Sequence, residues 1–171
     1  YSDSNKDSGI ASARWVLQEA QIALAKAAVT HKFDLFLFHG RGGTISRGGG
    51  KTNAAVLGSP PGTINGYLRV TEQGEIINEK YGLRGIALRT LEQAASSVAL
   101  ASAIPQYPKT DMPEWQTLMQ VIAEESQKKY QHLLHHSPGF NEYFRQATPI
   151  DLIEKMRIGS RPSSRSDDNS I

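Results

Sequence analysis

Apolar positions recur with a helical period along the first long stretch of the chain. From about Gly9 to His31 the residues are mostly Ala, Leu, Gln and Glu, which favour helices. Apolar side chains return at the spacing of helical turns, at Trp15, Val16, Ala20, Ala23, Leu24 and Ala27. Asp7 and Ser8 precede this stretch, and both residue types cap helix N-termini. The pattern predicts a helix over 9–31.

A shorter apolar pattern follows directly. Residues 32–39, KFDLFLFH, are apolar and aromatic and border a glycine-rich stretch, which predicts a buried strand. Residues 66–82, GYLRVTEQGEIINEKYG, predict two more short strands around a turn at Gln73-Gly74. The aromatic side chains expected in the core are Trp15, Trp115, Phe33, Phe36 and Phe38.

The remaining pattern is helical. One helical turn is predicted just after the glycine-rich stretch, and it is stopped by Gly58 and Pro60-Pro61. Longer and shorter helices are predicted at Arg84–Ile104, from Asp111 or Pro113 to about His135, at Asn141–Gln146, and after Thr148-Pro149 with Thr148 as cap. The predicted fold class is mostly α with a few short β-strands. Strand, loop and helix alternate in the first part, and α/β enzymes place their chemistry in such loops.

Composition and charge narrow the functional classes. The 171 residues are 39% hydrophobic and 21% charged, which is typical of a globular protein. A net charge of +2 argues against a strongly basic nucleic-acid-binding protein. The chain has no cysteine, so disulfides and thiolate metal sites are excluded and a reducing compartment fits. No apolar run reaches the roughly 18–20 residues of a membrane span.

Both ends of the sequence suggest a piece of a larger protein. The chain begins at Tyr1, inside the motif-like run YSDSNKDSG, and it closes with the polar run SRPSSRSDDNSI. We therefore expect a single partial domain with three parts. Residues 1–81 would carry strands and active-site loops, 82–156 a helical scaffold, and 157–171 an arginine-containing tail.

The glycine-rich stretch HGRGGTISRGGGKT, residues 39–52, raises three interpretations. Both common nucleotide-binding glycine motifs require glycine at position 45, where the residue is Ile45, so Lys51-Thr52 is incidental. Two Arg-Gly-Gly tripeptides resemble an RNA-binding box, but such boxes are usually many-fold. An anion cradle fits better, because glycines expose backbone N–H groups and Arg41 and Arg47 supply guanidinium groups. His39 would then transfer protons at the end of the strand. The alternative is a surface loop beside a strand-end histidine.

Further candidates lie outside this stretch. Asp3 and Lys6 in YSDSNKDSG can contribute to a hard-cation or anion site, or belong to a helix cap. Arg161, with Arg157 and Arg165, is either a solvated basic tail or part of a site. Gln73 can donate to an oxyanion from its turn. His132, His135 and His136 have a spacing that suits metal, although a helix C-terminus accounts for them equally well.

These segments together resemble one family, phosphoenolpyruvate carboxylase. The matching runs, in order along the chain, are YSDSNKDSG, LFHGRGGTISRGGG, PPGTINGYLRVTEQGE, YFRQATP and IGSRP. The resemblance extends from Tyr1 to about Arg165. Lys51 and Asn53 depart from the proline and histidine of many family members, and Ser164 departs from the lysine of some. The arginines and the histidine of the cradle are retained.

The resemblance implies carboxylation of phosphoenolpyruvate by bicarbonate to oxaloacetate and phosphate, with Mg²⁺ or Mn²⁺. It implies a β-barrel wrapped in helices, of which this chain would be an internal fragment, and a cytoplasmic, allosterically controlled homotetramer with no nucleic-acid or membrane partner. Asp3 would be a metal ligand, and Arg41, Arg161 and Gln73 would bind substrate. By the same resemblance the catalytic residues would be His39, Arg41, Arg47 and Lys6. We expect the isolated fragment to be inactive; the alternative is a non-catalytic anion-binding module.

Overall fold

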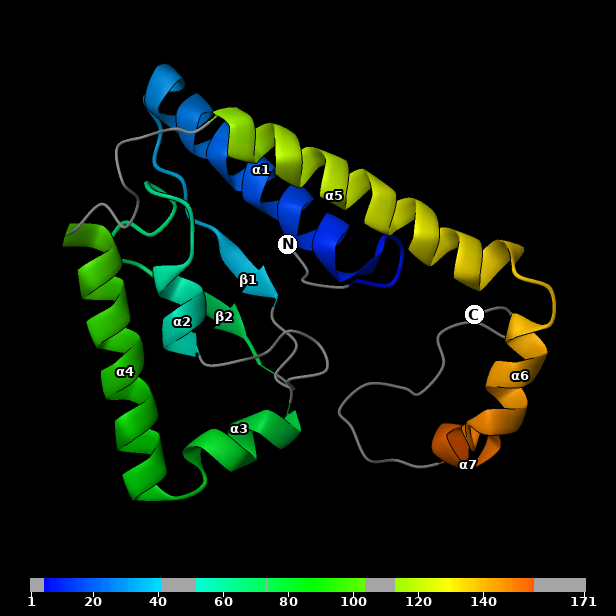
Figure 1. Ribbon diagram of the computed structural model, residues 1–171. Helices are drawn as coiled ribbons and strands as arrows, with labels where there is room; N and C mark the ends of the chain where they lie inside the picture. The colour runs from blue at the N-terminus through cyan, green and yellow to red at the C-terminus, as the bar shows by residue number, and fades with distance from the viewer. Residues whose placement is uncertain (1–4, 41–51, 73, 104–112, 156–171) are drawn as a thin grey trace.

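The computed structural model describes residues 5–40, 52–72, 74–103 and 113–155 (Figure 1). Predicted features at 1–4, 41–51, 73, 104–112 and 156–171 lie outside the described residues. The described part is mostly helical. Its elements are α1 (Gly9–His31), β1 (Phe38–Gly40), α2 (Thr52–Leu57), β2 (Arg69–Thr71), α3 (Gly74–Tyr81), α4 (Arg84–Ala103), α5 (Pro113–Gln131), a π-helical turn η2 (His132–His136), α6 (Phe140–Ala147) and α7 (Ile150–Lys155).

The first helix, α1, has the bounds that its sequence pattern predicts. Ser8 occupies the N-cap position, but its side chain makes no capping hydrogen bond, so the predicted side-chain cap is wrong. The backbone N–H of Gly9 instead donates to the carbonyl of Asn5, at 2.9 Å. The helix ends because Lys32 adopts a left-handed conformation, with φ 54°. That conformation turns the following N–H groups back onto the last carbonyls of the helix.

Helices α1 and α5 lie side by side and antiparallel (Figure 1). The Trp15 indole donates from Nε1 to Gln120 Oε1 at 2.8 Å, and the Ser12 hydroxyl lies 3.5 Å from Gln127 Oε1. Ala123 is buried in this interface. Small residues at positions 9, 12 and 123 allow the two helices to approach closely, which explains why polar side chains can bridge them.

The predicted strand at 32–39 is wrong in its extent. Only Phe38–Gly40 forms β1, and residues 33–37 have no regular structure. A strand is held by its neighbours. Within the described residues β1 has a single partner, the equally short β2. The apolar run indicates that these residues are suited to burial, but the described residues do not provide enough neighbouring strands to bury them all.

The aromatic residues expected in the core are mostly exposed. Phe36 is 62% exposed and meets the ring of Tyr67 edge-on, with centroids 5.1 Å apart. The Arg69 guanidinium lies 4.6 Å from the ring centroid of Phe38. Phe33 is also exposed, and Trp115 is 67% exposed. The core prediction is wrong for these residues, because no helix or strand of the described chain covers them.

Strands β1 and β2 pair in parallel, with α2 between them in sequence. Parallel strands need a crossover connection. The connection between β1 and β2 contains the helix α2, so the three elements form a β-α-β unit. His39 is opposite Val70 and Gly40 is opposite Thr71. Such a unit is the repeating element of a (β/α) barrel. One unit does not establish a barrel, so the barrel fragment stays a prediction.

The second half of the predicted 66–82 hairpin is wrong, because residues 74–81 form the helix α3. β2 pairs with β1 rather than with the segment that follows it. The residues after Gly74 carry Ile76 as their buried side chain, and α3 packs on α4. The predicted turn at Gln73-Gly74 includes Gln73, which lies outside the described residues. β2 ends before it at Thr71, and the element that begins at Gly74 is helical.

The later helices agree with prediction. α4, α5, α6 and α7 lie where the pattern placed them, except that α5 ends at Gln131 and the predicted last turn to about His135 is the π-helical turn η2. α4 packs against α2 (Figure 1). Thr148, predicted as a cap, lies at the C-terminal end of α6, and its N–H donates to the Phe144 carbonyl. The division of the chain at 81/82 and 156/157 stays a prediction.

The hydrophobic core of the described residues is small. Its buried apolar side chains are Ala28, Val56, Ile64, Ile76 and Ala123. Many larger apolar residues on α4 and α5 are exposed, including Leu88, Leu91, Leu118 and Val121. Exposed apolar side chains in this number are typical of surfaces that contact more protein. None of the helices in the described ranges is long and apolar enough to cross a membrane.

Candidate functional site

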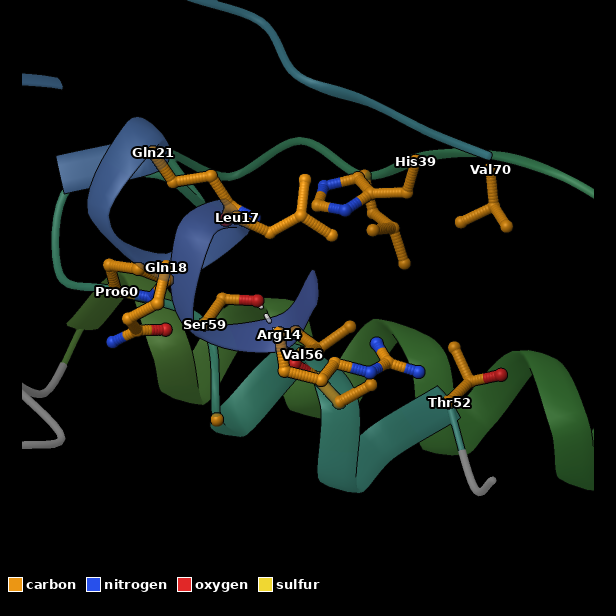
Figure 2. A pocket seen from close by; sticks show the side chains of 13 residues that line it. Arg14, Leu17, Gln18, Gln21, His39, Thr52, Val56, Ser59, Pro60 and Val70 are labelled. Atoms are coloured by element: carbon orange, nitrogen blue, oxygen red, sulfur yellow. Dashed lines mark hydrogen bonds between the residues drawn. The ribbon is translucent and has the colours of Figure 1, made fainter. Parts of the chain in front are cut away.

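A cavity of ≈ 230 Å³ lies between α1, α2 and the two strands (Figure 2). His39 forms part of its wall and is only 5% exposed, because it occupies the middle of β1. The residues that line the cavity are Arg14, Leu17, Gln18, Gln21, His39, Thr52, Ala55, Val56, Gly58, Ser59, Pro60, Leu68 and Val70. The cavity therefore combines apolar walls with a few polar groups, as small-molecule sites do.

The residues at the two ends of the predicted anion cradle, His39 and Thr52, border this cavity. β1 ends at Gly40, one residue after His39, and α2 begins at Thr52. His39 and Thr52 both line the cavity. Arg41 and Arg47 lie between these two ends and outside the described residues.

The register of the two strands brings a second predicted residue to the same edge. Gly40 and Thr71 are opposite one another at the carboxyl ends of β1 and β2. Arg41 follows the first, and Gln73 follows the second after Glu72. Gln73 itself lies outside the described residues. In α/β proteins, ligands bind at the carboxyl ends of parallel strands.

Of the other predicted site residues, the structure describes Lys6, which is not brought to the cavity. Lys6 lies in the turn before α1, is exposed, and does not line the cavity. Asp3 and Arg161 lie outside the described residues. Among the residues predicted for the site, the structure thus describes His39 and Lys6, and it places His39 alone of these two in the cavity wall.

Sequence reasoning missed the contribution of α1 to the cavity. Arg14, Leu17, Gln18 and Gln21 all line it. Their spacing of three, four and seven residues places them on one face of the helix. This face carries polar and apolar side chains together, whereas the pattern used for prediction followed apolar residues alone. A polar stripe on a helix that flanks a strand-end histidine is the signal that would have identified them.

A charged cluster lies just beyond the end of β2. Glu72 forms an ion pair and hydrogen bond with Lys80 of α3. Burial, the negative charge of Glu72 and a hydrogen bond to that carboxylate raise the pKa of Tyr81 above its ordinary value. The cluster connects the carboxyl end of β2 to α3 and fixes the side chain of Glu72, the neighbour of Gln73.

The described residues do not form a metal site. No group of three or more His, Asp or Glu side chains in the described ranges is placed to hold a metal ion, and this includes His132, His135 and His136. The rings of His132 and His136 lie 6.1 Å apart in the π-helical turn. The predicted ligand Asp3 lies outside the described residues, so the metal expectation stays a prediction.

Comparison with known proteins gives one consistent family. The family model described as phosphoenolpyruvate carboxylase matches residues 1–171. The chain is 52% identical over 165 residues to a phosphoenolpyruvate carboxylase of Xanthomonas oryzae pv. oryzae (strain MAFF 311018), covering 96% of the chain and 18% of that relative.

Two further relatives with the same printed name show similar coverage. Identity is 45% over 166 residues with that of Burkholderia vietnamiensis, covering 96% of the chain and 17% of the relative. With that of Pseudomonas putida (strain GB-1) it is 44% over 165 residues, covering 96% and 19%. The chain therefore spans less than a fifth of the length of the curated relatives that it matches.

Proposed function

The chain belongs to the phosphoenolpyruvate carboxylase family, and we propose that it is a segment of an enzyme that joins bicarbonate to phosphoenolpyruvate. The products would be oxaloacetate and phosphate. The observation that best supports this proposal is the position of His39. It is buried in a cavity wall, one residue before β1 ends at Gly40, and it is the first residue of the glycine- and arginine-rich stretch 39–52.

The proposed reaction has three chemical steps. A bicarbonate oxygen attacks the phosphorus of phosphoenolpyruvate, and the bond from phosphorus to the enol oxygen breaks, which gives carboxyphosphate and the enolate of pyruvate. Carboxyphosphate then releases CO₂ and leaves hydrogen phosphate, which retains the bicarbonate proton. The enolate carbon attacks CO₂ to form oxaloacetate. Both intermediates carry concentrated negative charge, so fixed cations and N–H donors stabilise them.

The arginines of the segment would carry that stabilisation. We assign Arg41 to the substrate phosphate and Arg47 to the same loop, because a guanidinium forms two parallel hydrogen bonds to a phosphate. Arg161 and Gln73 would bind further oxygen atoms of the substrate. The shared edge of β1 and β2 supports the convergence of Arg41 and Gln73, since each follows one of these strands.

His39 and Lys6 would serve the bicarbonate side of the reaction. An imidazole at the cavity wall can hold and return the bicarbonate proton during phosphoryl transfer. The cavity is large enough for a small anion with associated water. Arg14 contributes positive charge to its lining, which favours an anion there.

A divalent cation, Mg²⁺ or Mn²⁺, belongs to the proposal with Asp3 as one ligand. When bound, it would withdraw charge from the transferring phosphoryl group and the enolate. A single carboxylate does not satisfy a hard cation. Its other ligands would therefore come from parts of the longer protein outside this chain.

Exclusion of water is the remaining requirement, because water would protonate the enolate to pyruvate. Closure of the glycine-rich stretch 41–51 over the substrate would meet it, with glycines supplying the backbone freedom. We also propose that the full-length protein is a cytoplasmic homotetramer under allosteric control, as the family resemblance implies.

Isotope tracing in the full-length protein tests the proposal. Bicarbonate labelled with ¹⁸O and phosphoenolpyruvate should give oxaloacetate and phosphate in equal amounts, with an oxygen of bicarbonate in the phosphate. Phosphate that carries oxygen from water, with pyruvate as the partner product, would show a phosphatase instead and would overturn the proposal.

The isolated 171-residue segment provides the second measurement. We expect it to form no oxaloacetate, because the proposed metal ligands beyond Asp3 would come from parts of the longer protein outside this segment. Bicarbonate-dependent oxaloacetate formation by the segment alone would contradict this expectation. Tight binding of phosphoenolpyruvate by the segment, combined with an inactive full-length protein, would favour the alternative of a non-catalytic anion-binding module.

A further inference from the structure

The two faces of the β1–β2 pair differ in what covers them. Successive side chains of a strand point to opposite faces. His39 and Val70 are opposite one another in the register, and both line the cavity beside α1 and α2. Phe38 and Arg69 are the preceding pair, so they lie on the other face, where both side chains are exposed. The described residues therefore cover one face of the pair and leave the other exposed.

Aromatic side chains gather on the exposed face. The Arg69 guanidinium lies over the Phe38 ring, 4.6 Å from its centroid. Two residues earlier on each segment, the rings of Phe36 and Tyr67 meet edge-on with centroids 5.1 Å apart. Phe36 is 62% exposed and Tyr67 is 51% exposed. These four residues, Phe36, Phe38, Tyr67 and Arg69, form what we call the aromatic face.

The composition of the aromatic face is typical of a protein interface. Phenylalanine, tyrosine and arginine are enriched in the cores of such interfaces. A guanidinium stacked on a ring keeps the N–H groups at its edge available for a carboxylate. Covering this face would remove Arg69 from water, and a buried cation is tolerated only when an anion pairs with it. The covering segment must therefore be apolar over the rings and acidic at Arg69.

The longer protein can supply such a segment. The chain covers only 18% and 17% of the length of two relatives, so most of a protein of that size lies outside it. A two-stranded sheet is also marginally stable without further packing. We propose that a segment outside residues 1–171 packs on the aromatic face of the same subunit and places an Asp or Glu carboxylate against Arg69. This contact does not depend on which reaction the protein catalyses.

Photo-cross-linking in the full-length protein identifies the covering segment. Phe36 is replaced by the photoreactive residue p-benzoylphenylalanine, which retains an aromatic ring, and the product is located by peptide mass spectrometry. We expect a cross-link within one subunit, to a peptide outside residues 1–171 that contains Asp or Glu. A cross-link to a second subunit, a cross-link to a peptide within 1–171, or no cross-link would overturn the proposal.

The matched control is the same replacement at Tyr143, an aromatic residue of α6 that is 67% exposed. Its cross-linked peptide should differ from that of Phe36. Attachment of both positions to one peptide would show that the reagent selects a reactive segment rather than the partner of the aromatic face, and would also overturn the proposal.

Charge reversal tests the carboxylate. Arg69→Glu brings two negative charges together, so hydrogen exchange around Phe38 and in the cross-linked segment should accelerate at least about 10-fold. Arg89→Glu, at an exposed position of α4, should leave both rates unchanged. Substitution of Arg for the acidic residue of the segment should restore slow exchange in the Arg69→Glu protein. Unchanged exchange in Arg69→Glu, or failure of the second substitution to restore it, would contradict the ion pair.

A crystal structure of the wild-type full-length protein decides the question even if Arg69→Glu does not fold. A carboxylate oxygen from outside residues 1–171 should lie within about 4 Å of a guanidinium nitrogen of Arg69. Arg69 exposed to solvent, or paired only with a residue of 1–171, would refute the proposal. A wild-type protein that makes no oxaloacetate would remove the proposed function and leave this readout unaffected.

Discussion

Gly9 and Tyr130 are in such close contact that a Cβ atom on residue 9 would lie 3.2 Å from Cγ of the Tyr130 ring. Gly9 also has φ +73°, in the region that side-chain-bearing residues rarely adopt. The contact joins the start of α1 to the end of α5. The close packing of α1 and α5 at this end of the pair therefore depends on a glycine at position 9.

Gly9→Ala should weaken the α1–α5 pair. The left-handed conformation alone costs about 1–2 kcal/mol for a residue with a Cβ, and the ring of Tyr130 must also move. Hydrogen exchange in the full-length protein should therefore accelerate in α1 and α5. Gly139→Ala is the control for strain, since Gly139 has φ +74° but nothing within 4 Å of its Cβ position. Equal local destabilisation by both substitutions would show that the Tyr130 contact contributes nothing.

Gly82 and Gly85 should respond oppositely to alanine. A Cβ on Gly82 would lie 2.5 Å from the carbonyl oxygen of Asn78, so the end of α3 must shift, at a cost of about 1–3 kcal/mol. Gly85 lies in the first turn of α4 with open space around it, and alanine there should stabilise by up to about 1 kcal/mol. Thermal midpoints of the two variants measure this difference. Shifts of the same sign would contradict the prediction.

The free energy of unfolding should fall at alkaline pH because the Tyr81 phenol loses its proton there. The pKa of Tyr81 is raised in the folded protein, first by burial and then by Glu72. A raised pKa means that the fold favours the protonated phenol. The resulting stabilisation is full below the unfolded value of about 10 and is lost as pH rises through the folded pKa.

Tyr81→Phe removes this titration, so its thermal midpoint should fall less steeply than that of wild type between about pH 9 and pH 11. The ion pair of Glu72 with Lys80 is retained in the variant. Parallel pH profiles of the two proteins would show that Tyr81 makes no such contribution.

Arg41→Ala in the full-length protein should lose about 3–4 kcal/mol of transition-state stabilisation, by analogy with removal of an oxyanion donor. The corresponding fall in kcat/KM is about 10²–10³-fold. Arg89→Ala, at an exposed position of α4, is the control for loss of an arginine elsewhere. Near-normal turnover of the Arg41 variant would remove that residue from its proposed role.

The long helices could be predicted from the sequence because their period and their ends are local properties. α1 has its predicted bounds, and α4 begins at its predicted first residue, Arg84. The run 32–39 could not be predicted correctly, since an apolar pattern shows what is suited to burial but not which neighbours are present. The same limit explains α3, where the pairing of β2 with β1 decided against a hairpin.

The candidate site could be predicted in part. His39 was identified because it is the last residue of the apolar run 32–39, and the structure places it in a cavity wall. Arg14 and Gln21 could not be found by following apolar residues along α1, because their significance depends on which face of α1 lines the cavity that His39 also lines. That relationship is tertiary and appears only when the β-α-β unit is assembled.

The pairing of β1 with β2 has a consequence for how the segment behaves when it is produced alone. Within the described residues each of these strands has one neighbouring strand, so each has one edge along which no further strand pairs. Open strand edges accept further strands from whatever chain supplies them. In the longer protein, pairing with further strands would cover these edges during folding. Without them, copies of the segment would join edge to edge, and self-association in solution would then precede any loss of helical structure.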